Sequence, residues 1–95
     1  MVRKNAAHHL GKMEDLRALK FIQYAAENDE AEEVRKESVK AMGRLAEIDT
    51  LPALKRIQRV DVSSKVRYQA QRAIDAIRRK LDYIEKVKKK YKLDK

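Results

Sequence analysis

A period of 32 residues runs through the chain, and this repeat constrains the fold more than any other feature. A Val-Arg pair occurs three times, at residues 2–3, 34–35 and 66–67. Apolar residues follow each pair in the same order, so that Leu10, Met42 and Ile74 correspond. A unit this short cannot bury its apolar side alone, so neighbouring units must stack to form one continuous core.

A second block, Leu-x-Ala-Leu-Lys-x-Ile-Gln, occurs at residues 16–23 and again at residues 51–58. In both kinds of block the apolar residues recur every three or four positions, which is the spacing of one face of an α-helix. The sequence therefore predicts five helices, near residues 2–13, 15–27, 31–47, 50–60 and 63 to about 91.

The expected turns carry helix-capping residues. Asp49 or Thr50 can cap a helix whose first turn holds Pro52, and Ser63 can cap the helix that enters Val66. An acidic stretch from Glu27 to Glu33 precedes the Val34 helix, where carboxylates favour the positive end of the helix dipole. We expect this stretch to cap the helix, with partner binding as the alternative.

The motifs resemble a known family. Leu-Pro-Ala-Leu-x-x-Ile at residues 51–57, followed by Val-Arg-x-x-Ala at residues 66–70, resembles the short HEAT-like repeat of the PBS-lyase type. Residues 34–45 are similar to the second helix of that repeat. The resemblance covers roughly residues 2–79 and implies an all-α solenoid of five helices, or two and a half helical repeats. Because that family includes scaffolds, nucleic-acid binders and chromophore-lyase relatives, the fold alone does not settle the function.

The end of the chain departs from the repeat. Asp75 stands where the earlier copies have Gly11 and Gly43. After Ile77 the apolar series continues at helical spacing through Leu81, Ile84, Val87 and Tyr91. We expect a repeat domain over residues 1–80 and a basic helical extension over residues 81–95, packed on the stack or projecting from it. Covering the end of the stack is the favoured role, and a seam that joins two copies is the alternative.

The formal net charge is +9, and its distribution is uneven. On the second helix of each repeat, the residues expected to face solvent are mostly cationic: Lys4, His8 and Lys12, then Lys36, Lys40 and Arg44, then Tyr68, Arg72 and Arg79. Residues four apart lie about 6 Å apart along a helix, and packed helices lie about 8–10 Å apart. The rows predict a positively charged concave surface, whereas simple solvation of amphipathic helices is the alternative.

Other basic residues have separate expected roles. Arg3, Arg35 and Arg67 recur beside the core valines, and in similar repeats this arginine often holds neighbouring loops together, so we expect a structural role. The side chains of Lys88, Lys89 and Lys90 point in different directions around their helix. We expect them to attract a polyanion without forming a single binding face. Tyr68 lies within the basic surface and can stack on exposed bases, whereas Tyr83 and Tyr91 are expected to pack in the core or at its rim.

Features of most enzymes and metal sites are missing from the sequence. It contains no cysteine, and the adjacent residues His8 and His9 point about 100° apart on a helix, so they cannot chelate one metal. It has no glycine-rich phosphate loop, no GxSxG motif and no HExxH motif. We expect no enzymatic activity, no cofactor and no metal.

The absence of a signal peptide and of long apolar runs predicts a cytoplasmic protein without a membrane partner. The Lys-, Arg- and Glu-rich composition is also the bias of hyperthermophile proteins. The favoured function is binding of structured RNA or DNA, with a small component of a ribosome or ribonucleoprotein as one case. The alternatives are a scaffold for an acidic protein and a homodimer through the last helix.

Overall fold

The structure, a computed structural model, describes residues 18–92, and this part of the chain contains helices and no strand. Its four α-helices are α2 (Leu19–Asn28), α3 (Glu32–Leu45), α4 (Leu51–Val60) and α5 (Ser64–Tyr91), and a 3₁₀ turn, Ile48–Thr50, precedes α4. Three of the predicted helices thus correspond to α3, α4 and α5, and α2 covers most of a fourth. The predicted helix at residues 2–13 lies outside the described residues.

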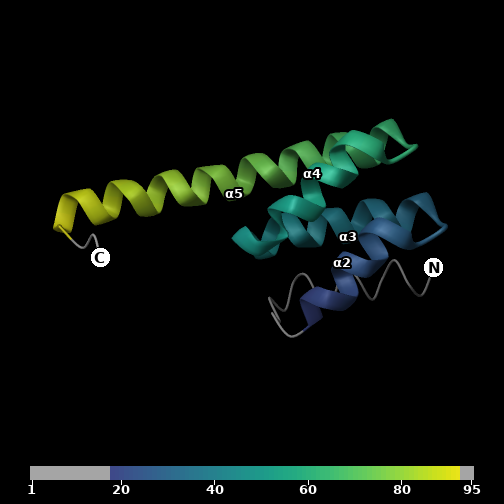
Figure 1. Cartoon of the computed structure of the whole chain (residues 1–95), viewed down its shortest axis with the longest axis horizontal. Coiled ribbons are helices and arrows are strands. Elements are labelled where there is room, and N and C mark those ends of the chain that lie inside the picture. Colours follow the sequence, from purple (N-terminus) through teal and green to yellow (C-terminus); the bar gives the residue numbers. More distant parts are fainter. Residues whose placement is uncertain (1–17, 93–95) are drawn as a thin grey trace.

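The helices form two stacked pairs. α2 packs against α3, and α4 packs against α5. The pairs meet mainly where α3 contacts α5, with a smaller contact between α2 and α4. Figure 1 shows α3 between α2 and α5, with the chain running through the pairs in order. The stack therefore has α2 and α4 in one layer and α3 and α5 in the other.

The core lies between these two layers. Its largest fully buried apolar side chains come from all four helices: Ile22, Val34, Val39, Met42, Leu54, Val66 and Ile77. The burial of Val39 and Ala41 was not predicted. The repeat pattern alone points only to the row of Val34, Ser38, Met42 and Leu45. The wider buried surface of α3 follows from its central position, because it packs against a helix on each side.

The helix ends test the predicted caps. Ser63 caps α5 as predicted, because its side-chain hydroxyl accepts a hydrogen bond from the Val66 backbone N–H at 3.3 Å. The predicted side-chain cap of α4 is wrong. Thr50 stands at the capping position, but its hydroxyl donates to the Glu47 carbonyl at 2.7 Å, and Asp49 lies within the 3₁₀ turn. The turn keeps Thr50 in a helical conformation, which does not aim its oxygen at the first N–H groups of α4.

α3 ends two residues earlier than predicted. Ala46 adopts a left-handed conformation with φ of 49°, and its backbone N–H donates to the Met42 carbonyl. A residue in this conformation commonly terminates a helix. The early end leaves room for the loop and the 3₁₀ turn that lead into α4.

α5 is one uninterrupted helix of 28 residues, about 42 Å long at 1.5 Å per residue. Leu81 still packs against the core, but most residues beyond it are exposed. Figure 1 shows this end of α5 running well beyond the other helices. The described part of α5 beyond Leu81 therefore projects from the stack. None of the helices in residues 18–92 combines the length and apolar character that a membrane span requires.

Candidate functional site: a basic groove between α3 and α5

An open groove of about 330 Å³ lies between α3 and α5. We call it the basic groove, and its lining consists of Lys40, Gly43, Arg44, Gln69, Arg72, Ala73, Ala76 and Arg79. Lys40 and Arg44 stand one turn apart on α3, and Arg72 and Arg79 stand about two turns apart on α5. Two helices that are distant in sequence thus bring four cationic side chains to one concave site.

Small residues form the contact between the two helices in this groove. A Cβ atom at Gly43 would lie 3.2 Å from both the Cα and the Cβ of Ala73, which is a tight contact. The glycine therefore allows α3 to approach α5 closely at this point. Ala73 and Ala76 add only methyl groups, so the longer cationic side chains extend past a small apolar floor.

Glutamates neutralise part of the cationic row on α3. Lys36 lies 3.0 Å from Glu33, and Lys40 lies 3.5 Å from Glu37, each pair being one turn apart on the helix. The hydrogen bond to Glu33 raises the pKa of the Lys36 ammonium above its ordinary value. Each of these two lysines shares its charge with the glutamate three residues before it, which weakens the positive charge predicted for the α3 row.

Three arginines dominate the charge of the groove. Arg44, Arg72 and Arg79 are exposed, and none forms an ion pair within residues 18–92. A guanidinium group presents a planar fork of donors that matches a carboxylate or a phosphate. The lining contains no carboxylate, hydroxyl, thiol or imidazole. The groove thus offers positive charge and hydrogen-bond donors to an anion.

Only some of the predicted binding residues lie in the basic groove. The basic groove brings together Lys40, Arg44, Arg72 and Arg79. It does not include Lys36 or Tyr68, although Tyr68 is exposed on α5.

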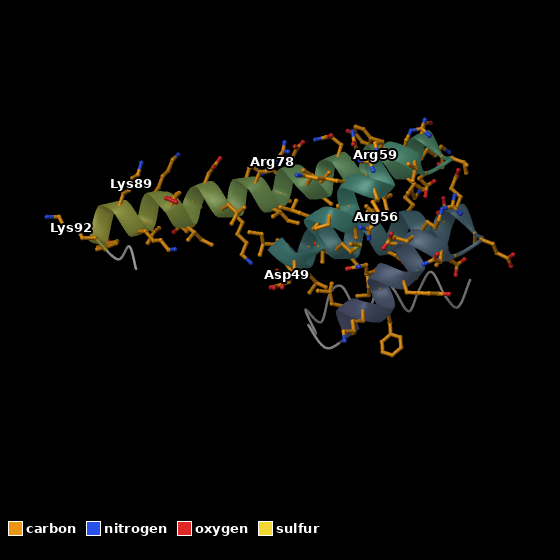
Figure 2. All side chains as sticks on the ribbon, in the orientation of Figure 1. Asp49, Arg56, Arg59, Arg78, Lys89 and Lys92 are labelled. Atoms are coloured by element: carbon orange, nitrogen blue, oxygen red, sulfur yellow. The ribbon has the colours of Figure 1, made fainter. Side chains whose placement is uncertain are left out.

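The remaining predicted residues lie away from the groove. Lys88, Lys89 and Lys90 are exposed on the last turns of α5, and Figure 2 shows Lys89 near the projecting end of the helix. Tyr83 and Tyr91 are exposed there too, so the expectation that they pack in the core or at its rim is wrong. Lys4, His8, Lys12 and Arg3 lie outside the described residues.

Arg35 connects the α2–α3 loop with the α4–α5 loop. Its Nε and Nη2 atoms donate to the Asp61 carboxylate at 2.9 and 3.2 Å, and its Nη1 atom donates to the Asp29 carbonyl at 2.9 Å. Arg67 makes the corresponding bond to the carbonyl of Asp61, six residues before it. These guanidinium groups hold loops in place.

The sequence reasoning missed Asp61 and placed Asp29 only within the acidic stretch before α3. Asp29 and Asp61 lie 32 residues apart and play the same role, since each carboxylate accepts a hydrogen bond from the backbone N–H two residues later. The repeat register itself carries this signal. Ala76 corresponds to Arg44 in the same register. Gln69 in the groove has no comparable signal, because its position depends on how α3 crosses α5.

Residues 18–92 contain no group of three or more His, Cys, Asp or Glu side chains that could hold a metal ion.

Stacked helical pairs with a basic groove on one layer define a helical-repeat protein with a surface suited to binding. The family model for HEAT repeats matches residues 1–75, and the chain belongs to the HEAT-repeat family. Members of this family generally serve as protein-interaction scaffolds. Neither the curated proteins nor the solved structures include a match to the chain.

Proposed function

We propose that this protein is a non-enzymatic interaction module that binds an acidic protein segment in the basic groove. The observation that carries the proposal is the presence of Arg44, Arg72 and Arg79 at one groove without an ion-pair partner in residues 18–92. Ion pairs between exposed groups contribute at most about 1 kcal/mol each, because solvent screens them. Three arginines at one groove can add such contributions and so select an acidic ligand.

The chemistry of the floor favours a protein ligand. Ala73, Ala76 and Gly43 form a small apolar surface beneath the arginines. The methylene groups of a glutamate side chain can contact this surface while its carboxylate meets a guanidinium. The general role of HEAT repeats as protein-interaction scaffolds also supports this choice.

Nucleic acid remains the alternative ligand. The same arginines, together with Lys88, Lys89 and Lys90, would attract phosphates through the release of condensed counterions. Binding of RNA or DNA therefore stays a prediction of the sequence, and the test of the proposal must include both polymers.

The test measures fluorescence anisotropy of labelled poly-L-glutamate, a structured RNA hairpin and a DNA duplex over a range of salt concentrations. The groove variant carries Arg44→Glu and Arg72→Glu. Its matched control carries Lys55→Glu and Arg59→Glu on α4, which changes the net charge equally; both control residues are exposed, and Figure 2 shows Arg59 on α4. Arg44 and Arg59 each lie in the last turn of their helix, so the substitutions affect the helix ends similarly.

We expect the groove variant to bind poly-L-glutamate at least tenfold more weakly than the wild type, since tenfold corresponds to about 1.4 kcal/mol. The control variant should bind within about threefold of the wild type, because only screened long-range charge is changed. Equal losses in the two variants would show that net charge, not the groove, binds the ligand. If RNA binds with a salt slope near −5, as about six phosphate contacts require, and poly-L-glutamate does not bind, the proposal is wrong and the nucleic-acid alternative holds.

A further inference from the structure

The projecting end of α5 carries an apolar face that the described part of the chain leaves largely uncovered beyond Leu81. We call residues 81–91 the α5 extension, and its apolar stripe consists of Leu81, Ile84, Val87 and Tyr91. Their spacing of three or four residues keeps them within about 120° of the helix circumference. Ile84 is 37% exposed and Tyr91 is 61% exposed. The stripe continues the buried row that ends with Ile77, so it extends the core of the stack into solvent.

A second cavity lies at the foot of this stripe. It has a volume of about 140 Å³, and its lining consists of Ala46, Glu47, Ile48, Ile77, Lys80, Leu81 and Ile84. Ile48 is half exposed beside it. Lys80 donates to the Ala46 carbonyl across the cavity at 3.2 Å, which fixes the α3–α4 connection against α5. Because a cavity near 150 Å³ can hold a benzene-sized group, this one has room for one apolar side chain.

The positive charge around the apolar stripe favours an acidic partner. Between Arg78 and Lys92 there are eight basic residues and only two acidic ones, Asp82 and Glu85. Figure 2 shows Arg78 and Lys89 on the same side of α5, pointing away from the stack. A second copy of the chain would place an equally basic helix against this one, and the like charges would repel each other. An acidic partner would be attracted instead.

The extension has little tertiary packing to stabilise it. Its 11 residues form about three turns at the end of α5, whose packed part nucleates the helix but does not cover these turns. Most helical stability in proteins comes from packing of an apolar face, and here that packing is largely missing beyond Leu81. A partner that covers the stripe would therefore also order the helix.

We infer that the α5 extension docks an acidic amphipathic helix of a partner protein, with one apolar side chain of that helix in the cavity beside Ile48. The stripe supplies the apolar seam, and the surrounding lysines pair with carboxylates that flank the seam of the partner helix. A bilayer surface or a nucleic-acid backbone has no side chain to place in the cavity. This surface is separate from the basic groove, so the inference does not depend on the proposed groove ligand.

The test uses a synthetic 21-residue peptide with leucine at the first and fourth positions of each heptad and glutamate elsewhere. Binding to the full chain is measured by anisotropy, and hydrogen exchange of the backbone amides is followed by mass spectrometry. The test variant carries Ile84→Gln and Val87→Gln. The control carries Asp82→Gln and Lys89→Gln, which change two exposed residues on the opposite face of the same segment and leave the net charge unchanged.

We expect the wild type to bind the peptide and the test variant to bind at least tenfold more weakly, because two apolar contacts are lost. The control should stay within about threefold, and exchange in residues 81–91 should slow in the complex as the helix gains packing. Poly-L-glutamate has no apolar side chains, so its binding to the groove should be unchanged in the test variant. If poly-L-glutamate fails to bind the wild type but the peptide binds, the groove proposal fails and this inference stands.

Three outcomes would overturn the inference. The first is equal peptide affinity in the wild type and the test variant. The second is slow exchange in residues 81–91 without peptide, together with a dimeric mass by light scattering, which would identify a second copy as the occupant. The third is an absence of peptide binding while an RNA hairpin or vesicles of anionic phospholipid protect the same residues.

Discussion

Replacing Asp61 with alanine should destabilise the fold strongly. Its carboxylate accepts hydrogen bonds from Arg35 Nε at 2.9 Å, from Arg35 Nη2 at 3.2 Å and from the Ser63 backbone N–H at 2.9 Å. The Arg35 side chain is only 12% exposed and that of Asp61 only 6%. Water therefore has little access to replace the lost carboxylate, and within residues 18–92 the guanidinium keeps only the carbonyls of Asp29 and Glu30.

The burial of the pair sets the size of the effect. Removal of one partner from a buried ion pair costs about 3–5 kcal/mol. A domain of this length has a total free energy of unfolding of about 5–14 kcal/mol, so the variant should lose a large share of its stability. Urea denaturation followed by circular dichroism measures the change. With a slope near 2 kcal/mol/M, a loss of about 4 kcal/mol lowers the midpoint by about 2 M without changing the slope.

An exposed pair of similar geometry is the control. Glu27 accepts from Arg56 Nε at 3.1 Å and from Nη2 at 3.2 Å, but the Arg56 side chain is 51% exposed. Figure 2 shows Arg56 on α4. Glu27→Ala should cost at most about 1 kcal/mol, because exposed pairs are screened by solvent. If Asp61→Ala costs no more than Glu27→Ala, the reasoning from burial is refuted.

Three further substitutions test the core and one cap, each by thermal or urea unfolding. Leu54 is fully buried, so Leu54→Ala should cost about 2–5 kcal/mol, and a loss below 1 kcal/mol would contradict its place in the core. Ser63→Ala should cost about 1 kcal/mol through the lost cap of α5, and an unchanged urea midpoint would count against that cap. Ser38 is fully buried, and its hydroxyl has no hydrogen-bond partner in the described chain. Ser38→Ala should stabilise the fold by about 1 kcal/mol and raise the melting temperature by about 4–8 °C, whereas a lower melting temperature would show that the hydroxyl is satisfied.

Much of the fold could be predicted because its signals are local. The spacing of apolar residues located α3, α4 and α5 to within a few residues, and Ser63 marked the start of α5. The hydrogen bond that the Thr50 hydroxyl forms could not be predicted in the same way. Its hydroxyl bonds to Glu47 only because a 3₁₀ turn precedes α4, and the sequence pattern does not distinguish that turn from a capped helix start.

The groove was predictable in part for a similar reason. The repeat register aligned Lys40 with Arg72, and helical spacing placed Arg44 one turn after Lys40; the structure places all three in one groove. The lysine–glutamate pairs on α3 were missed even though their spacing of three residues is visible in the sequence. The tight contact of Gly43 with Ala73 has no such signal, because it depends on the angle at which two distant segments cross.

Both proposed surfaces belong to α5, and this arrangement has a physical consequence. The basic groove uses Arg72 and Arg79, and the apolar stripe begins at Leu81, only half a turn further along the same helix. A partner that presents an acidic segment to the groove and an amphipathic helix to the extension would bind the second site at a high effective concentration. Its affinity would then exceed that of either site alone. Because Ile77 and Leu81 pack against the core, the stack holds the direction of the helix at the point where the two surfaces meet.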